Sequence, residues 1–366
     1  MKIVRVETFH TTYVCFVRLT AEDGSTGWGQ TSPFGADLTA DLLHRLVAPI
    51  ALGKDSTKIG STVRSCFRER FVFKFRGPFL CRAVCGIDTA LWDLAGKRER
   101  KSVCELLGGS PRAIPVYASS MRRETSPSQE VEGFKKWRDQ RGANAYKYKI
   151  GVPAGDDADA FPGRSEELIA SVGREFPGSF IVADGNGGYS PARAVEISKL
   201  LKEGGVAYFE EPCVYWDIDA TAQVNASSEV PVCGGEQDYD LLRWQLIFEK
   251  RAVSLAQPDV CYLGGLSQTL EVVGMAEQHG LSIMPHASNP SMVLLFSMHL
   301  MAAIPNPGPY LEYGMDESPW VTDAFSPALE MVDGKVAIPD GPGWGITMNE
   351  EWLDRAEYRC SELERS

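Results

Sequence analysis

Three acidic residues stand at equal distances along this chain, and their spacing is its strongest chemical feature. Asp184, Glu210 and Glu236 are separated by 210 − 184 = 26 and 236 − 210 = 26 residues. Each lies at or just after the end of a short apolar run, so one strand–helix unit separates it from the next. Three converging carboxylates repel one another unless a hard divalent cation with oxygen ligands neutralises them. The spacing predicts a Mg²⁺ site with one ion per subunit, although any single acid after a strand could instead cap a helix.

Two lysines in Tyr146-Lys147-Tyr148-Lys149-Ile150 could supply a base beside that site. Residues two apart on a strand share a face, so Lys147 and Lys149 point the same way. Tyr148 and Ile150 suit the helix-covered outside of a barrel, which would leave both lysines inside. Two inward ammonium groups are expected to depress each other's pKa, and a nearby divalent cation would depress it further, so that a lysine tuned in this way can act as a general base near neutral pH. An exposed edge strand with solvated lysines is the alternative interpretation.

Asp259 and His286 follow neighbouring strand-like runs and could form an acid–base pair. A carboxylate that holds a histidine fixes its tautomer and raises its basicity. His286 follows the apolar run 281–284 and opens a loop, whereas the other four histidines are interpreted as structural hydrogen-bonding residues. Glu312 ends the last run and could face a substrate oxygen opposite the metal.

Eight short apolar runs that alternate with helical segments would position these side chains. The runs are Ile114–Ser119, Ala145–Ile150, Phe180–Asp184, Ala207–Glu210, Val232–Gly234, Val253–Gln257, Ser282–Pro285 and Tyr310–Glu312. Such alternation indicates parallel βαβ units, and eight units closed on themselves form a barrel whose carboxyl-terminal rim carries the chemistry. A doubly wound sheet is the alternative, but no run is followed by G-x-G-x-x-G.

The first 112 residues lack this alternation. Strand-like runs at Ile3–His10, Thr12–Leu19 and Thr26–Gln30 precede a helical segment at Arg82–Leu107, which predicts an α+β capping domain over residues 1–112. Residues 113–330 are assigned to the barrel, and residues 331–366 to a C-terminal segment that packs back on the cap. In the tail we expect strand and turn at 329–338 and then a charged helix. The predicted fold class is α/β: a (β/α)8-type, modified TIM barrel with an α+β N-terminal capping domain completed by the C-terminal tail.

Composition narrows the class of protein further. A length of 366 residues suits a barrel of about 250 residues with a smaller companion domain. A net charge of −12 disfavours nucleic acid and anionic membrane surfaces as partners. No signal peptide or apolar span is present, and the nine scattered cysteines lack a C-x-x-C pair, so we expect reduced thiols in a cytoplasmic protein.

Taken together, these residues resemble the enolase superfamily and, within it, the mandelate racemase subgroup. The likeness extends to the cap phrases Gly27-Trp28-Gly29-Gln30 and Asp88-Thr89-Ala90-Leu91-Trp92-Asp93-Leu94-Ala95-Gly96-Lys97. The family's K-x-K, metal carboxylates, Asp–His dyad and late glutamate match Lys147, Lys149, Asp184, Glu210, Glu236, Asp259, His286 and Glu312. Asp259 stands five residues before Gly264-Gly265, where the muconate-lactonizing type has a lysine, which argues against the cycloisomerase and dipeptide-epimerase branches.

The resemblance implies Mg²⁺-dependent removal of the α-proton of a small carboxylate substrate by way of an enediolate. Lys149 would take the proton on one face, while Lys147 holds a substrate carboxylate oxygen. His286, tuned by Asp259, would act on the other face. Glu312 would donate a hydrogen bond to the enediolate, and Asn186 could contact a substrate oxygen.

Dehydration of an acid sugar, either an aldonate or an aldarate, is the favoured reaction because that class of relatives is populous. The alternatives are a racemase or epimerase of a 2-hydroxy acid and a non-catalytic metal-binding relative. The short hairpin at 10–13 leaves little apolar flap for an aromatic substrate. The basic cluster Arg68, Arg70, Lys74 and Arg76 could bind a second carboxylate or be solvated surface. We also expect a homo-oligomer, as is usual in this family.

Overall fold

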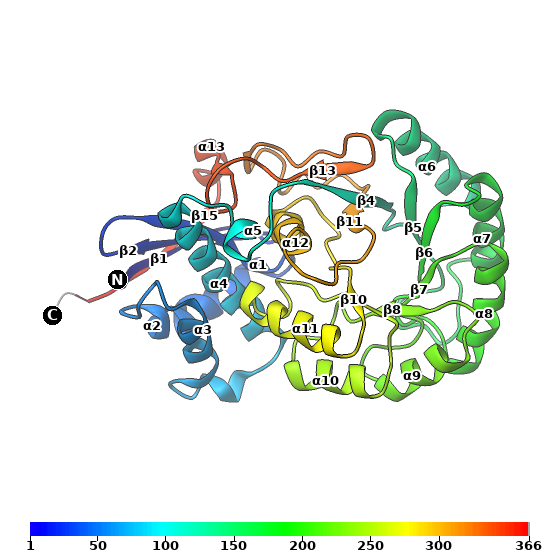
Figure 1. Ribbon diagram of the computed structural model, residues 1–366, viewed down its shortest axis with the longest axis horizontal. Helices are drawn as coiled ribbons and strands as arrows, with labels where there is room; N and C mark the ends of the chain where they lie inside the picture. Colours follow the sequence, from blue (N-terminus) through cyan, green and yellow to red (C-terminus); the bar gives the residue numbers. More distant parts are fainter. Residues whose placement is uncertain (365–366) are drawn as a thin grey trace.

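Eight parallel strands curl into a barrel in the computed structural model, which describes residues 1–364 (Figure 1). Their hydrogen-bonded order is β10-β9-β8-β7-β6-β5-β4-β11. The ring closes where the backbone N–H of Ile283 donates to Asn306 at 2.9 Å and that of Gly308 donates to Ile283 at 2.6 Å. The strands are β4 (Ala113–Ser119), β5 (Ala145–Lys149), β6 (Phe180–Asp184), β7 (Tyr208–Glu210), β8 (Val232–Gly234), β9 (Leu255–Ala256), β10 (Ser282–Ile283) and β11 (Leu311–Gly314). The predicted barrel is confirmed.

Seven helices lie between successive strands and cover the outside of the barrel (Figure 1). They are α6 (Pro127–Arg141), α7 (Arg164–Glu175), α8 (Pro191–Glu203), α9 (Ile218–Ser227), α10 (Leu241–Glu249), α11 (Leu266–Gln278) and α12 (Met292–Met301). Serine followed by proline begins two of them, because the Ser126 and Ser190 hydroxyls accept from the third backbone N–H and proline suits the first turn. These caps orient α6 and α8 against the strands.

Successive side chains of β5 point alternately into the barrel and outwards to the core beneath the helices. Ala145 belongs to the small apolar cluster inside the barrel, and Lys147 and Lys149 share its side of the strand. Tyr146 and Tyr148 pack in the larger core beneath the helices. The lysine side chains are almost entirely buried, with exposed fractions of 0% and 6%. The inward orientation expected for these lysines is therefore present.

The cap is a four-stranded antiparallel sheet with helices packed on it, and the N-terminus and β15 lie on its side of the molecule (Figure 1). The sheet order is β15-β1-β2-β3, from β1 (Ile3–His10), β2 (Cys15–Ala21), β3 (Thr26–Gln30) and β15 (Glu357–Glu362). Its helices are α1 (Ala36–Leu42), η1 (Leu43–Val47), α2 (Ala48–Ala51), α3 (Ile59–Arg68), η2 (Val72–Phe75), α4 (Pro78–Glu99) and α5 (Val103–Leu106). The expected α+β cap, completed by the C-terminal tail, is confirmed.

Two expectations about helices are wrong. The segment predicted as one helix at 82–107 is divided, because Arg100 adopts a left-handed conformation and Ser102 begins α5 with a capping box to Glu105. The tail does not end in a charged helix. Within the described residues only α13 (Glu350–Leu353) is helical there, and β15 pairs antiparallel with β1 instead, which covers an otherwise open sheet edge.

The remaining short strands lie in the C-terminal segment. They are β12 (Phe325–Ser326), β13 (Lys335–Ala337) and β14 (Thr347–Met348). Strand β13 pairs antiparallel with β4, with Val336 opposite Ile114. The strand and turn expected at 329–338 are present, and they join the C-terminal segment to the barrel.

Close packing of β3 on α4 explains the glycines of the motif Gly27-Trp28-Gly29-Gln30 in the cap. A Cβ at Gly27 would lie 2.2 Å from the Ala90 carbonyl oxygen, so only glycine allows this approach. Gln30 then reaches the barrel, where its amide donates to the Ser291 hydroxyl at 2.9 Å and accepts from the Met292 backbone at 3.0 Å. The motif thus fixes the cap against α12.

His299 is a structural residue that must remain neutral. Its Nδ1 accepts a hydrogen bond from the Cys104 backbone N–H at 3.1 Å, and its ring packs edge-on against Trp344. Burial lowers the pKa of His299 from 6.5 to about 4. Because the folded value lies below the unfolded one, the stabilisation is complete above the unfolded pKa and is lost as the pH falls towards the folded pKa.

We therefore expect His299→Asn, whose side-chain oxygen takes the place of Nδ1 as an acceptor for Cys104 but does not titrate, to flatten the acid side of the stability profile. Between pH 6.5 and 4 the free energy of unfolding should fall by about 3 kcal/mol more in the parent protein than in the variant. Denaturant titrations at steps of pH measure this difference. Parallel profiles for the two proteins would contradict it.

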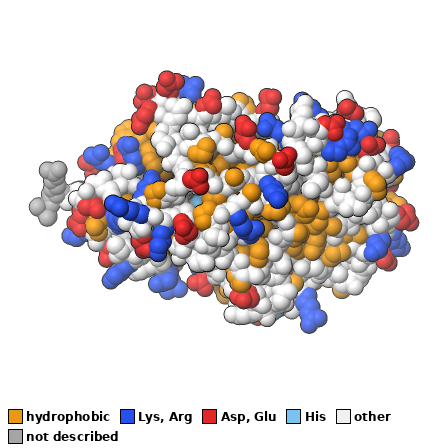
Figure 2. All heavy atoms as spheres, turned by 45° about the horizontal axis from the view of Figure 1, so that its top comes forward, with side chains coloured by type: hydrophobic (Ala, Val, Ile, Leu, Met, Phe, Trp, Pro, Cys, Tyr) orange, Lys and Arg blue, Asp and Glu red, His pale blue; other side chains and the backbone are white. Residues whose placement is uncertain are grey.

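Charged side chains of both signs are scattered over the face shown in Figure 2, around a broad hydrophobic area. Among residues 1–364, no helix is both long and apolar enough to cross a membrane.

Candidate catalytic and metal site

The carboxyl ends of the barrel strands bring all nine predicted site residues to one mouth of the barrel. Lys147 and Lys149 come from β5, Asp184 ends β6, and Glu210 ends β7. Glu312 lies within β11, and the others follow strands: Asn186, Glu236, Asp259 and His286. Eight of these side chains are connected by ion pairs to at least one other member, and Asn186 donates its backbone N–H to Asp184 at 2.8 Å.

The three equally spaced acids form a compact cluster. One carboxylate oxygen each from Asp184, Glu210 and Glu236 lies within 4.8 Å of the others, and all three side chains are buried. Parallel pairing explains the convergence, because β6 and β7 place Asp184 and Glu210 opposite each other in register. Three hard oxygen donors at this spacing fit Mg²⁺, with substrate or water oxygens completing its coordination.

The two lysines contact these acids directly. Lys147 Nζ lies 2.6 Å from both Glu210 Oε1 and Glu312 Oε1. Lys149 Nζ contacts Asp184 Oδ2. Lys149 also lines the open cavity, whereas Lys147 is enclosed by its carboxylate partners. Of the two, Lys149 is therefore the lysine that faces the cavity directly, and Lys147 would reach a ligand by exchanging one of its carboxylate partners.

Asp259 and His286 form the predicted dyad. His286 Nδ1 lies 2.7 Å from Asp259 Oδ2, which leaves Nε2 directed at Glu236 and Glu312, at 3.5 and 3.7 Å. Asp259 is itself held by the backbone N–H groups of Cys261 and Tyr262 at 2.7 and 2.9 Å. The carboxylate is thus fixed before it orients the imidazole.

Negative charge exceeds positive charge in this mouth, which further supports a bound cation. Burial raises the pKa of Glu210 to about 8, and Asp184 and Glu312 add to the rise while Lys147 opposes it. Burial disfavours the charged form of His286, but Glu236, Glu312 and Asp259 together raise its pKa to about 10. Glu312 is buried as well, yet Lys147 and His286 lower its pKa to about 2. A divalent ion would relieve the repulsion among the carboxylates.

A cavity of about 390 Å³ opens over these groups. Lys149 and His286 reach it from β5 and from the loop after β10, with β11 and β4 between these strands on one side of the ring. Aromatic rings form part of its wall, including Tyr262, whose centre lies 5.9 Å from that of His286. The volume suits a small organic ligand.

Three further residues contribute to the site without having been predicted. Glu211 is buried beside the triad, and its Oε1 has no hydrogen-bond partner among the described residues. Gln257 donates to Glu210 at 2.7 Å, and Arg123 donates to the Asn186 side chain at 2.8 Å. Asn186 and Glu211 both have positive φ, of 41° and 40°, and such strained backbone often occurs at functional sites. Gln257 ends a predicted strand, so the rule that selected the acids could also have selected it.

The basic cluster at 68–76 does not reach this cavity. None of its four side chains is among the described residues that line it. Arg76 pairs with Asp240 at 3.0 Å, and Arg68 lines a separate cleft between α3, α4 and α11. The proposed role of this cluster in binding a second substrate carboxylate is therefore wrong for this cavity.

Comparison with known proteins places the chain in a family. Residues 2–108 match the model of the mandelate racemase/muconate lactonizing enzyme N-terminal domain, and residues 129–352 match the enolase C-terminal domain-like model. An arabinonate dehydratase from Saccharolobus solfataricus is 27% identical over 96% of this chain and 92% of its own length. Other curated relatives are named as galactonate dehydratases and as cycloisomerases.

Solved structures agree with this placement. A Roseobacter denitrificans protein, provisionally named a racemase, is 44% identical, with a TM-score of 0.97 over 99% of this chain and all of that one. A mandelate racemase/muconate lactonizing protein from Paracoccus denitrificans, complexed with magnesium, is 26% identical, with a TM-score of 0.90 over 100% and 99% of the two chains. With its barrel, its cap and its carboxylate triad, the chain belongs to the enolase superfamily, in the mandelate racemase subgroup.

Proposed function

We propose that this protein dehydrates an acid sugar, an aldonate or an aldarate, after Mg²⁺-dependent removal of the proton beside the carboxylate. One observation carries the proposal: Lys149 and His286 approach the same cavity from different sides, above the carboxylate triad. An acid and a base placed in this way can act on neighbouring carbon atoms of one substrate. Relatives named as dehydratases of sugar acids support the substrate class.

Each residue then has a distinct task. Asp184, Glu210 and Glu236 hold Mg²⁺, which supplies the positive charge that acidifies the α-proton and stabilises the enediolate. Lys149 removes the α-proton, and Lys147 binds a carboxylate oxygen of the substrate. His286, oriented by Asp259, gives a proton to the departing β-hydroxyl. Glu312 and Asn186 contact substrate oxygens.

Racemisation or epimerisation of a 2-hydroxy acid is the second candidate. The same pair favours it, because a base on each side of an α-carbon can remove a proton from one face and return it to the other. The Roseobacter denitrificans relative, provisionally named a racemase, also supports it. Since other relatives are named as cycloisomerases, Asp259 by itself does not separate the reactions that follow proton removal.

Incubating a library of mono- and diacid sugars with the Mg²⁺-loaded protein in deuterated water tests the proposal. A substrate should lose its α-proton signal in the NMR spectrum and form a 2-keto-3-deoxy product. Exchange of the α-proton with inversion of configuration at the α-carbon, without loss of water, would identify a racemase or epimerase. A non-catalytic metal-binding relative would exchange no member of the library, and that result would refute the proposal.

The metal site makes a separate prediction. Glu236→Gln should weaken Mg²⁺ binding by at least about tenfold, because even partners outside the first coordination sphere have effects of that size. Calorimetric titration with Mg²⁺ measures the change. Glu203→Gln, at an exposed position on α8, is the matched control and should bind as the parent does. Equal affinity in the Glu236 variant would exclude this carboxylate from the site.

The cellular location and the oligomeric state are also proposed. We infer a cytoplasmic protein because all nine cysteines are free thiols and eight of them are buried. A homo-oligomer is expected from the family, and sedimentation analysis tests it.

A further inference from the structure

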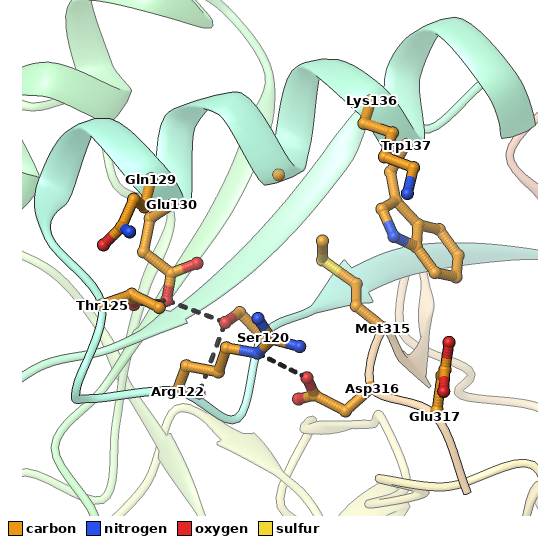
Figure 3. Close-up of a pocket in the computed structure, with 11 residues that line it drawn as sticks. Ser120, Arg122, Thr125, Gln129, Glu130, Lys136, Trp137, Met315, Asp316 and Glu317 are labelled. Atoms are coloured by element: carbon orange, nitrogen blue, oxygen red, sulfur yellow. Dashed lines mark hydrogen bonds and ion pairs between the residues drawn. The ribbon is translucent and has the colours of Figure 1, made fainter.

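A second cavity, of about 620 Å³, lies outside the barrel beneath α6 (Figure 3). The loops after β4 and β11 form its other sides. Ser120, Arg122 and Thr125 come from the first loop, and Asp316 and Glu317 come from the second. Its volume falls in the range of small-molecule sites, and no residue of the proposed catalytic machinery lines it.

The segment from Ser119 to Arg123 is a wall shared by the two cavities. The odd-numbered side chains of this segment contact residues of the catalytic site or line its cavity. Ser119 donates to Glu312 at 2.8 Å, Met121 lines the catalytic cavity, and Arg123 donates to Asn186 at 2.8 Å. The even-numbered residues between them, Ser120 and Arg122, line the outer cavity instead.

The even-numbered side chains of the wall face the outer cavity. Ser120 donates to the buried Glu130 at 2.8 Å, and Arg122 donates to Asp316 at 2.7 Å, as the dashed lines in Figure 3 mark. Asp316 also accepts from the Met121 backbone at 3.1 Å. A ligand that contacts Ser120 or Arg122 would therefore touch the backbone that carries Met121 and Arg123.

Polar groups remain available to such a ligand. Within residues 1–364, the Lys136 ammonium, the Trp137 indole N–H and the Glu317 carboxylate make no hydrogen bond or ion pair, and the Lys136 and Glu317 side chains are exposed. Lys136 and Trp137 are adjacent donors on α6, and Glu317 is an acceptor on the opposite loop (Figure 3). Donors on one side suit a carboxylate, and acceptors on the other suit hydroxyl groups.

We infer that the outer cavity binds a polyhydroxylated monocarboxylic acid. The lining holds three carboxylates, Glu130, Asp316 and Glu317, against the two cations Arg122 and Lys136, which disfavours a second ligand carboxylate, while the two cations disfavour a polyamine. The lining alone sets this assignment, which does not depend on the reaction in the catalytic cavity. Because the two cavities share a wall, occupancy of the outer one should change the rate of α-proton exchange in the inner one.

Gly133 is a position at which a larger side chain would reduce the volume of the outer cavity. It lies in the middle of α6 and lines the cavity, and a Cβ placed there would have the Met315 methyl group at 3.8 Å as its nearest neighbour. The Cβ position is therefore free of backbone, and its nearest neighbour is the end of a flexible side chain. Glycine is also unfavourable in a helix, so substitution here should not unfold the protein.

Calorimetric titration of the Mg²⁺-loaded protein with D-gluconate tests the inference. Gly133→Leu should weaken one binding event by at least about tenfold, whereas Gly133→Ala should leave it unchanged within about twofold. Gly274→Leu, on α11 where a Cβ would meet no atom within 4 Å, is the matched control for leucine in a helix. The diacid D-glucarate should bind this site at least about tenfold more weakly than gluconate.

Several results would overturn the inference. Identical isotherms for the leucine and alanine variants at position 133 would show that gluconate binds elsewhere, and the absence of binding to the parent would exclude the site. Equal affinity for glucarate would refute the assignment to monoacids. If no sugar acid exchanges its α-proton, the proposed function fails, yet a difference between the two Gly133 variants would still establish the outer site.

Discussion

Lys149→Ala should lose exchange of the substrate α-proton by about 10²–10⁴-fold, the usual contribution of a positioned acid or base. Lys149 is the lysine that reaches the cavity, since Lys147 is enclosed by Glu210 and Glu312. Substrate should still bind, because the carboxylate triad does not include Lys149. NMR in deuterated water, with substrate held above its KM, measures the exchange rate directly.

Lys149→Arg distinguishes a base from a counter-ion. Arginine preserves the positive charge beside Asp184 but cannot give up its proton at neutral pH. If Lys149 removes the proton, the arginine variant should be as inactive as the alanine variant. Recovery of exchange in Lys149→Arg would mean that the lysine only neutralises Asp184, and another residue would then have to be the base.

The sequence predicts the site well because strand ends converge in a barrel. Acids spaced one strand–helix unit apart must lie on adjacent strands, so the sequence alone places Asp184, Glu210 and Glu236 together. The lysines followed from the two-residue period of β5, with Tyr146 and Tyr148 packed outside. In both cases the spacing of residues along the chain determines where their side chains lie in the barrel.

Features that depend on distant contacts could not be predicted in this way. The tail becomes β15 because the edge of β1 needs a partner, and that edge is more than 340 residues away in sequence. The role of Glu211 depends on its positive φ, which turns its side chain beside the triad rather than away from it. The outer cavity combines α6 with a loop near residue 316, and neither segment suggests a cavity alone.

The sequence predicts the position of Lys147 but only one of its contacts, because acidic side chains outnumber basic ones in the mouth of the barrel. The expected partner was a substrate carboxylate, whereas the structure gives it Glu210 and Glu312. These pairs lower the pKa of Glu312 and oppose the rise at Glu210. Burial disfavours the charged form of Lys147, but Glu210 and Glu312 raise its pKa well above its usual value, so the expectation that its pKa is depressed is wrong for this lysine. A cation at the triad would compete with Lys147 for Glu210, so metal binding and the position of this lysine are coupled through one carboxylate.

His286→Asn should separate the two halves of the proposed reaction. Asparagine can still donate to Asp259, but it cannot transfer a proton as imidazole does. Loss of water should slow by about 10²–10⁴-fold, while exchange of the α-proton by Lys149 should continue. His279→Asn, at an exposed position at the end of α11, is the matched control and should behave as the parent does.

The same variant distinguishes the two candidate reactions. A dehydratase that lacks His286 would exchange the α-proton of its substrate and release no 2-keto product. A racemase that lacks it would exchange the proton of only one stereoisomer, because Lys149 reaches a single face of the α-carbon. Undiminished dehydration in His286→Asn would contradict both schemes, since it would mean that the dyad contributes no proton and that the β-hydroxyl leaves with help from another group.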